Sequence, residues 1–459
     1  MIDPRVASGL RDLLPAAMIV RERALASFRE ALSSFGFVPI ETPHIERMEV
    51  LTGKGAGSEE VLRQIYEVTN KGGERGELGL RFDLTVPLAR FVARNIQDLG
   101  RPFKRYAVGS VFRGERPAKG RFREFLQCDF DIVGTESLLS DAEIVQVVAD
   151  ALGKIGVPAF TITLNHRKIL DGLFRNMNLG FRSASLLRSL DKLQKIGRAG
   201  VFEEMQAKST STGSDSDPAV TSDQANQILD FVELGRGDVG VLDQVAPLLK
   251  DQPQSLSAIE ELRTLFDLIE AGGVPASRLR VDVGLARGLD YYTGMVLETT
   301  VDGWEGFGSI ASGGRYDNLT RLFTDQPLPG VGASIGLDRL MALFEEAGWS
   351  KGPATSVPVL IANVAGVDPR ALIQIAARLR SVGIGAEVYP DAIQTGKQMQ
   401  YGSTRGHRFA LIVGQDEQAN GLFNLRELAT RSDRKGLALS ELETIVGEAV
   451  ASREPGASR

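Results

Sequence analysis

A short basic segment followed by a row of hydrogen-bond acceptors is the part of this sequence best suited to chemistry. Residues 101–123 (RPFKRYAVGSVFRGERPAKGRFR) carry six arginines and two lysines against one glutamate, whereas the whole chain has a net charge of −6. A basic concentration on an acidic background is typical of a protein with an anionic partner, phosphate above all. Because side chains alternate along a strand, Gln127, Asp129 and Asp131 in the following EFLQCDFDIVG share one face. This layout predicts a pocket that holds a phosphate next to a cationic or donor group.

Composition narrows the class of protein. The chain has 459 residues, 43% of them hydrophobic and 24% charged, which is typical of a globular protein with two or three domains. No secretory signal and no bilayer-length apolar stretch is evident, so we expect a cytoplasmic protein that does not enter a membrane. The single cysteine, Cys128, lies on the apolar face of its strand and is predicted to be a packed core thiol. The three histidines, His44, His166 and His407, form no ligand-spaced cluster, so no metal site made by the protein alone is expected.

The elements that must position these residues can be read from periodicity. Apolar spacing predicts a helix over 17–34, a hairpin over 104–133 and a helix over 141–154. The segment RFDLT (81–85) is interpreted as a strand that turns into a helix, which would place Arg81, Asp83 and Thr85 on one face. A carboxylate beside a hydroxyl on that face could hold an ammonium group, although a surface salt bridge would account for the same residues.

Changes in composition divide the chain into four segments. Residues 1–166 and 271–349 are predicted to be two parts of one catalytic domain, and residues 167–270 a helical insertion between them. After a Gly/Pro/Ser linker, residues 358–452 alternate strands with helices, which predicts an α/β domain with a largely parallel core. Within the insertion, the polar stretch 207–223 (AKSTSTGSDSDPAVTSD) is expected to be a mobile loop, because it can bury little apolar surface.

Three glycine-containing motifs leave alternatives open. GASIG (332–336) matches the nucleophile elbow of hydrolases, with Ser334 as nucleophile and His407 as base, but its small residues equally suit close packing of strands. SGGRYDNL (312–319) and RGLDYYTG (287–294) join glycines to Arg, Asp and Tyr. Glycine permits close approach to a ligand and arginine offers a planar donor fork for phosphate or carboxylate, yet a bulge and core tyrosines would also explain them.

Taken together and in order, these segments resemble the histidyl-tRNA synthetases, a family of class II aminoacyl-tRNA synthetases. The resemblance covers nearly the full chain and is carried by RFDLT, FRGERPAKGRFREFLQCDFDIVG, ARGLDYYTG, SGGRYDNL and GVGASIGLDRL. It implies an α+β fold with an antiparallel six-stranded catalytic sheet flanked by helices, a helical insertion and a C-terminal α/β anticodon-binding domain. It also implies a homodimer built partly on residues 35–47 (FGFVPIETPHIER).

The same resemblance implies an ATP-dependent ligase that activates L-histidine to its adenylate and transfers it to tRNA(His), with Mg²⁺ accompanying ATP. The residues that it assigns to histidine are Asp83, Thr85, Gln127, Asp131, Arg287, Tyr291 and Tyr292, of which Asp131 and Tyr292 read the imidazole. Those that it assigns to ATP are Arg113, Glu115 and Arg339, and those expected at the tRNA acceptor end are Arg116, Lys119, Arg121 and Arg123. Arg113 and Arg287 are the expected catalytic residues.

The implied chemistry suits a chain with few histidines. The substrate carboxylate is already an anion, so its attack on the α-phosphate needs no general base. Catalysis then depends on alignment and on cations facing the charge that builds on phosphate oxygens. The main rival is a catalytically inactive synthetase-like regulatory subunit of histidine biosynthesis. Such relatives typically lack the anticodon domain and the signature arginine, whereas this chain has residues 358–452 and Arg287.

Overall fold

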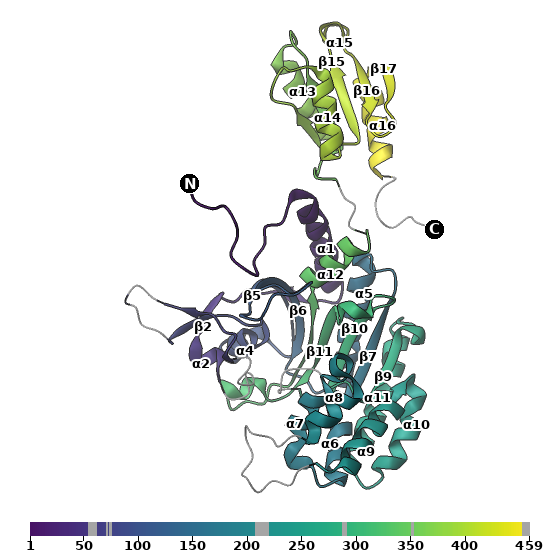
Figure 1. The fold of residues 1–459 in the computed structure, drawn as a ribbon. Coiled ribbons are helices and arrows are strands. Elements are labelled where there is room, and N and C mark those ends of the chain that lie inside the picture. The colour runs from purple at the N-terminus through teal and green to yellow at the C-terminus, as the bar shows by residue number, and fades with distance from the viewer. Residues whose placement is uncertain are drawn as a thin grey trace. The chain divides into compact units, whose positions relative to one another are not determined.

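The computed structural model describes residues 1–53, 62–69, 72, 76–206, 220–286, 292–349 and 353–451. The chain divides into two compact units (Figure 1). The first unit comprises Met1–Arg11 with Ala26–Leu343, and the second comprises Asp12–Leu25 with Phe344–Arg459. Across the described ranges, no helix combines the length and the apolar character needed to cross a membrane.

The first unit is built on a nine-stranded sheet in the order β1-β5-β6-β12-β11-β10-β7-β9-β8. Its six central strands pair antiparallel throughout: β5 (Phe103–Phe112), β6 (Glu124–Val133), β12 (Gly330–Gly336), β11 (Ala311–Tyr316), β10 (Met295–Val301) and β7 (Phe160–His166). The short strands at the edges are β1 (Val38–Pro39), β9 (Leu279–Asp282) and β8 (Arg236–Gly237). The antiparallel sheet implied by the resemblance is therefore confirmed, with short strands added at both edges.

Helices flank this sheet, as expected. They include α1 (Pro15–Ser34), α4 (Thr85–Leu99), α5 (Leu138–Ile155) and α12 (Leu337–Glu346). The helix predicted over 141–154 begins earlier, because the Ser137 side chain accepts a hydrogen bond from the Leu139 N–H and caps the first turn. It ends at Ile155 and is followed by Gly156, whose φ of 94° is a left-handed conformation that glycine adopts readily. A short α2 (Met48–Leu51) lies beside a small sheet of β2 (Ile45–Arg47), β4 (Leu78–Leu80) and β3 (Glu67–Val68).

The prediction of a strand at RFDLT is wrong. β4 ends at Leu80 and α4 begins at Thr85, so Arg81, Asp83 and Thr85 do not alternate along a strand. Instead Asp83 Oδ1 accepts hydrogen bonds from the backbone N–H groups of Thr85 at 3.1 Å and Val86 at 2.9 Å. A short acidic side chain that bonds to nearby backbone N–H groups favours the start of a helix over a strand. Arg81 is buried and donates to the backbone carbonyls of Thr42 and Ser110.

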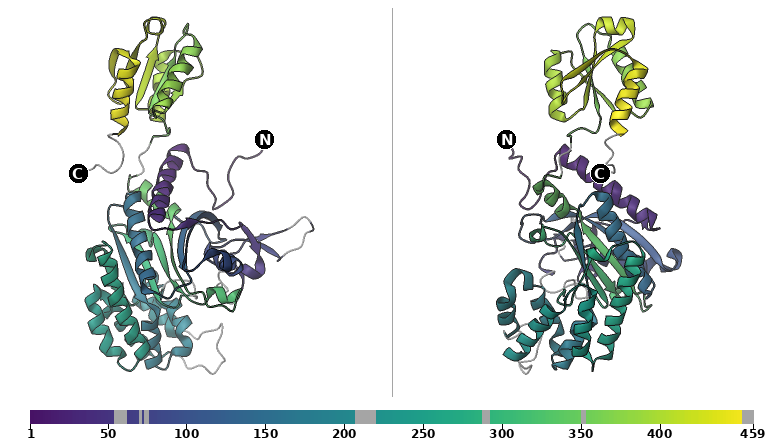
Figure 2. Two further views of the ribbon diagram at one scale, coloured as in Figure 1. Left: turned by 180° about the vertical axis from the view of Figure 1, so that it is seen from behind. Right: turned by 90° about the vertical axis from the view of Figure 1, so that its right-hand side faces the viewer.

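The insertion folds into a block of helices. Both views in Figure 2 show this block at one end of the first unit. Its helices are α6 (Arg167–Asn176), α7 (Ser183–Leu190), α8 (Leu193–Gln206), α9 (Ser222–Leu234), α10 (Leu242–Val245) and α11 (Pro253–Ala271). Most of the predicted mobile loop, residues 207–219, lies outside the described residues. Its last two residues belong to α9, because Thr221 and Gln224 cap that helix reciprocally.

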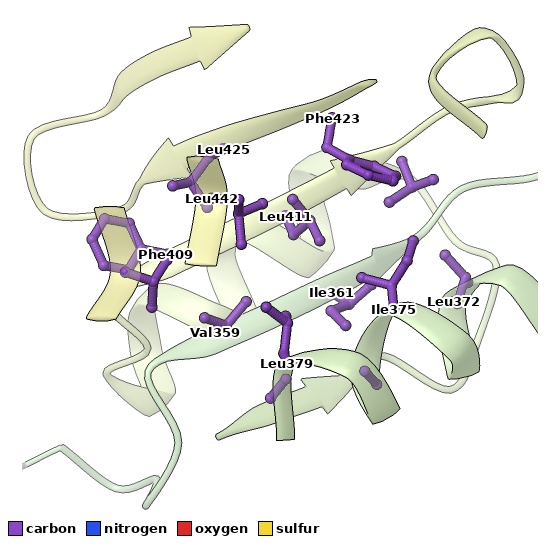
Figure 3. Packing of buried hydrophobic residues seen from close by; sticks show 14 of the residues in the cluster. Val359, Ile361, Leu372, Ile375, Leu379, Phe409, Leu411, Phe423, Leu425 and Leu442 are labelled. Atoms are coloured by element: carbon purple, nitrogen blue, oxygen red, sulfur yellow. The ribbon is translucent and has the colours of Figure 1, made fainter. Parts of the chain in front are cut away.

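The second unit contains a five-stranded sheet in the order β14-β13-β15-β16-β17. The predicted parallel core is confirmed for β13 (Val359–Asn363), β14 (Ala386–Val388) and β15 (Phe409–Val413), whereas β16 (Leu422–Glu427) and β17 (Ser432–Ala438) add antiparallel strands. Its helices are α13 (Pro369–Ser381), α14 (Thr395–Arg405), α15 (Gln415–Asn420) and α16 (Leu439–Ala451). Figure 3 shows how Val359, Ile361 and Leu411 on the strands pack with Leu379 and Leu442 from α13 and α16.

Candidate active site

A cavity of about 290 Å³ lies against one face of the central sheet. It is lined by Phe82, Asp83, Thr85, Arg113, Gln127, Asp129, Asp131, Tyr292, Ser312, Tyr316, Gly332, Ala333 and Ser334. The alternation predicted for β6 is confirmed, because Gln127, Asp129 and Asp131 all line the cavity. Cys128, on the opposite face, is buried as a core thiol. We call this space the acidic cavity.

A second cavity of about 160 Å³ adjoins it, which we call the basic cavity. Its lining includes Glu115, Phe125 and Arg339 and, from the loop between β5 and β6, Gly120, Arg121 and Phe122. The two cavities share four lining residues: Arg113, Gln127, Ser312 and Ser334. Residues expected to bind the amino acid and residues expected to bind the nucleotide therefore line adjoining spaces that meet at Arg113.

Arg113 is held in place by two aromatic rings. Its guanidinium carbon lies 4.4 Å from the centroid of the Phe82 ring and 5.0 Å from that of Phe125, and its Nε donates to the Phe82 carbonyl at 3.2 Å. Stacking on aromatic faces restrains a planar guanidinium without consuming its donor fork. Arg113 is thus restrained at the junction of the two cavities.

The far side of the basic cavity is formed where β12 passes into α12. Arg339, near the start of α12, lines the cavity and donates from Nη1 to the Ser309 carbonyl at 2.6 Å. Phe125 also lines this cavity and was not identified from the sequence. The signal was available, because Phe125 has the same parity on β6 as Gln127 and therefore shares its face.

Three aspartates, Asp83, Asp129 and Asp131, are buried together around the acidic cavity. Burial raises the pKa of each, because a low-dielectric surrounding disfavours the charged form. The positive charge of Arg105 opposes that rise for all three aspartates. Burial prevails for all three, and it raises the pKa of Asp129 to about 7. The cavity thus concentrates carboxyl groups whose protonation depends on what else occupies it.

The raised pKa of Asp129 predicts a pH dependence of stability. Between its unfolded value of 3.8 and about 7, the folded chain keeps a proton that the unfolded chain releases. Asp129 should therefore make the free energy of unfolding fall as pH rises through this window, by on the order of 4 kcal/mol, and contribute no further change above it. Urea unfolding at about pH 5 and about pH 8 should show a smaller pH difference in Asp129→Asn than in the unmodified protein. The exposed Asp98→Asn serves as control, and an equal pH difference in all three proteins would contradict the prediction.

Paired glycines bring β11 and β12 close to the site residues. Gly314 and Gly332 lie opposite each other in the antiparallel ladder. A Cβ added to Gly332 would lie 2.0 Å from Asp131 Oδ1, and one added to Gly314 would lie 2.9 Å from the Tyr292 ring. The glycines of SGGRYDNL form no bulge and approach side chains of the cavity wall, and Tyr316 is buried in the core, whereas their close approach to a ligand stays a prediction.

The hydrolase interpretation of Ser334 finds no support in the described residues. Ser334 lies in a regular antiparallel strand, opposite Asp129, and its Oγ accepts a hydrogen bond from Gln127 Nε2 at 3.3 Å. The described histidines have other partners: His44 lies 3.2 Å from Arg81 Nη2, His166 lies 3.2 Å from Glu261, and His407 lies 3.0 Å from Glu387. No histidine among them is hydrogen-bonded to Ser334 to act as its base.

Two residues predicted from the sequence cannot be placed. Arg287 and Tyr291 lie outside the described residues. Their neighbour Tyr292 lines the acidic cavity and packs against a buried cluster that includes Val86, Ala89 and Tyr316.

The basic residues of the β5–β6 loop divide into two groups. Arg116, Lys119 and Arg121 are exposed. The loop tip is closed by paired backbone hydrogen bonds between Ala118 and Arg121. Arg123 differs, because its guanidinium donates to the backbone carbonyls of Ser8 and Glu115, both at 3.1 Å. Three of the four arginines and lysines expected at the tRNA are therefore exposed to solvent, and the fourth holds the N-terminal segment to the loop.

The N-terminal segment reaches the wall of the basic cavity through Arg11. Its guanidinium carbon lies 3.7 Å from the Phe122 ring centroid, and its Nη2 pairs with Asp338. Asp338 Oδ2 in turn accepts from the Leu126 N–H at 2.5 Å. Arg11 thereby joins the β5–β6 loop to the start of α12, and both Phe122 and Asp338 line the basic cavity.

If ATP occupies the basic cavity, as the resemblance implies, Arg11→Ala is expected to raise the KM for ATP about tenfold and leave the KM for the amino acid nearly unchanged, because only that cavity loses its brace. Pyrophosphate exchange at varied ATP and varied amino acid separates the two constants. Arg5→Ala is the matched control, since the exposed Arg5 pairs with the exposed Asp3. Equal changes in both KM values for Arg11→Ala would show that the brace is not specific to the basic cavity.

Comparisons with known proteins agree on one family. The model of the family described as "Histidyl-tRNA synthetase" matches residues 9–340, and the "Anticodon binding domain" model matches residues 359–449. The histidine–tRNA ligase of Rhodopirellula baltica is 44% identical over 434 residues, which is 95% of each chain. The crystal structure of histidyl-tRNA synthetase from Nostoc sp. PCC 7120 superposes with a TM-score of 0.85 at 34% identity, covering 98% of this chain and all of that one.

A structure described as an ATP phosphoribosyltransferase regulatory subunit/histidyl-tRNA synthetase, from Bacillus halodurans C, is also similar. Its TM-score is 0.69 at 22% identity, covering 86% of this chain and 95% of that one. A likeness at this identity shows a common fold and does not favour the regulatory interpretation.

Proposed function

Because this chain belongs to the histidyl-tRNA synthetase family, we infer that it is a histidine–tRNA ligase, and we propose which of its residues bind each substrate. The observation that carries the proposal is the pair of adjoining cavities that share Arg113 and Gln127. Histidine occupies the acidic cavity and ATP the basic cavity. The reacting carboxylate and α-phosphate then meet where the two cavities join.

The acidic cavity suits the α-ammonium and imidazole of histidine. Asp83, Thr85 and Gln127 supply carboxylate, hydroxyl and amide groups for the amino-acid backbone, and all three line this cavity. Asp131 and Tyr292, also on the lining, read the imidazole. A site whose buried polar groups await particular partners penalises ligands that cannot pair with them, so these residues select histidine over apolar amino acids of similar size.

In the first step, the histidine carboxylate attacks the α-phosphorus of ATP and pyrophosphate leaves. Arg113 faces the charge that develops on the phosphate oxygens, and Arg287 is proposed to act with it. Glu115 and Arg339 bind the nucleotide in the basic cavity, with Arg339 stacking on it. In the second step, a ribose hydroxyl at the tRNA end attacks the acyl carbon and AMP leaves.

Mg²⁺ is proposed to enter with ATP. This ion is usually held by one or two carboxylates together with substrate phosphates. Within the described ranges, no three His, Cys, Asp or Glu side chains form a group that could hold a metal. Two acidic residues, Glu115 and Asp338, line the basic cavity. Asp338 is already engaged by Arg11 and the Leu126 N–H, so Glu115 is the carboxylate that we propose to reach the ion.

The tRNA is proposed to approach the β5–β6 loop with its acceptor end. The exposed Arg116, Lys119 and Arg121 offer positive charge for its phosphates, and Arg123 anchors the loop from which they project. Residues 1–166 and 271–349 would then be the catalytic domain, 167–270 the insertion, and 358–452 the anticodon-binding domain.

We also propose a cytoplasmic homodimer. Residues 35–47 include β1, an edge strand whose Val38 and Pro39 are both exposed. Ile45 is exposed nearby in sequence. An exposed edge strand with apolar side chains is a ready surface for pairing with another chain.

Light scattering should report twice the monomer mass, and Val38→Lys should shift the species toward monomer.

The activity and its specificity are tested by ATP–pyrophosphate exchange run with each of the twenty amino acids. Exchange with histidine alone is expected, followed by charging of tRNA(His) in the complete reaction. A regulatory subunit would exchange with none of them. Exchange led by another amino acid would overturn the assignment of the acidic cavity.

A further inference from the structure

Arg105 is a buried charge that the proposed mechanism has not used. It is 1% exposed and is the largest fully buried side chain among the described residues. It lies on β5 directly opposite Asp131 of β6, and its Nη2 lies 2.5 Å from Asp131 Oδ2. Burying an arginine inside a sheet costs free energy unless its charge is paired with an opposite charge.

The contacts of Arg105 differ from those of a structural arginine. Arg81, also buried, donates from Nε and Nη1 to two backbone carbonyls and so ties β5 to the segment before β2. The Nε and Nη2 of Arg105 are buried, and neither makes a hydrogen bond among the described residues. Its close ionic contact is the Asp131 carboxylate. Arg105 therefore pairs with a carboxylate, whereas Arg81 holds backbone segments in place.

Asp131 is held from both of its oxygens. Oδ2 pairs with Arg105, and Oδ1 accepts from the Tyr316 hydroxyl at 2.6 Å. Asp131 and Tyr316 line the acidic cavity, whereas Arg105 is not part of its described lining. A carboxylate oxygen can accept about two hydrogen bonds, so each oxygen of Asp131 keeps capacity for a ligand.

We propose that Arg105 is a positioning residue that keeps Asp131 ionised and aimed at the imidazole of the bound histidine. This inference rests on the proposed function of the acidic cavity. An ionised Asp131 accepts a hydrogen bond from an imidazole N–H. A protonated Asp131 would present a donor there instead, and the ring N–H would lose its acceptor.

The charges around Asp131 explain why a cation is needed. Asp83 and Asp129 are buried beside it, and like charges in a buried site cannot all ionise without a counter-charge. The positive charge of Arg113 opposes the rise in the pKa of Asp83. Tyr316 is a neutral donor, because burial raises its pKa well above the usual value. Among the described residues, Arg105 is thus the cation in direct contact with Asp131.

The test compares Arg105→Met, Arg105→Lys and Asp131→Asn, alone and in combination, by ATP–pyrophosphate exchange in the full-length protein. Arg105→Met is expected to raise the KM for histidine about tenfold or more, with the KM for ATP within about twofold of the unmodified protein. Arg105→Lys, which keeps a cation, should recover most of the affinity. In the Asp131→Asn background, Arg105→Met should add no further increase, since no charge remains to be held.

Arg90→Met is the matched control. Arg90 makes two hydrogen bonds to the buried Glu46, away from both cavities, so its loss removes an Arg–carboxylate pair without touching the site. Its KM for histidine should not change. If Arg105→Met alone does not fold, the doubly neutral Arg105→Met/Asp131→Asn protein and Arg105→Lys still report the coupling.

The inference is overturned if Arg105→Met changes the two KM values equally. It is also overturned if Arg105→Lys is as impaired as Arg105→Met, or if the effects of Arg105→Met and Asp131→Asn on the KM for histidine simply add. These results leave the proposed function standing, because the unmodified protein would still exchange with histidine. Absence of exchange in the unmodified protein would instead remove the proposed function itself.

Discussion

Replacing Arg113 with alanine is expected to slow adenylate formation by roughly a hundredfold to a thousandfold. Arg113 lies where the acidic and basic cavities meet and is restrained by the rings of Phe82 and Phe125. Removing a preorganised donor costs most in the transition state, where charge on the phosphate oxygens is greatest. Rapid-quench measurement of histidyl-adenylate formation at saturating substrates should show the loss in rate.

The control for this variant is Arg94→Ala, an exposed arginine of α4, which should leave the rate unchanged. The KM for histidine should change little in Arg113→Ala, because Asp83, Thr85, Gln127 and Asp131 remain. A near-normal rate in Arg113→Ala would mean that the α-phosphate does not lie at the junction of the cavities.

Gly332→Ala is expected to raise the KM for histidine by about a hundredfold. A small displacement of the Asp131 carboxylate, which is proposed to recognise the imidazole, is enough to weaken binding strongly. The new Cβ would lie 2.0 Å from Asp131 Oδ1 and 2.7 Å from the Phe130 carbonyl, so either the carboxylate or the strand must move. Moving Asp131 breaks its contacts with Arg105 and Tyr316. Initial-rate exchange at varied histidine measures the effect.

Gly153→Ala is the matched glycine control. Gly153 lies within α5, where an added Cβ meets nothing within 4 Å, so alanine should stabilise the helix by about 1 kcal/mol and leave both KM values alone. A normal KM for histidine in Gly332→Ala would show that Asp131 does not contact the substrate.

Much of the site could be predicted from local sequence. Strand alternation placed Gln127, Asp129 and Asp131 on one face of β6 and Cys128 on the other, because period-two geometry depends only on neighbouring residues. The same reasoning applied to RFDLT was wrong, since Asp83 bonds the backbone N–H groups of Thr85 and Val86 and begins a helix instead. Short acidic side chains can override an alternating pattern in this way.

Contacts between segments that are distant in sequence could not be predicted from local sequence patterns. Arg11 meets Asp338 across 327 positions of sequence, and nothing local to either residue indicates the pair. Arg105 lay within the recognised basic segment, but its pairing with Asp131 depends on the register of β5 with β6, which the hairpin prediction left open. The roles of Arg287 and Tyr291 stay predictions, because both lie outside the described residues.

The account rests on histidine and ATP filling two cavities that meet at Arg113. A crystal structure with a non-hydrolysable histidyl-adenylate analogue tests this directly. We predict the imidazole between Asp131 and Tyr292, the phosphate mimic at Arg113, and the adenine beside Phe125 and Arg339. An analogue bound elsewhere, or one bound with its imidazole in the basic cavity, would contradict the account.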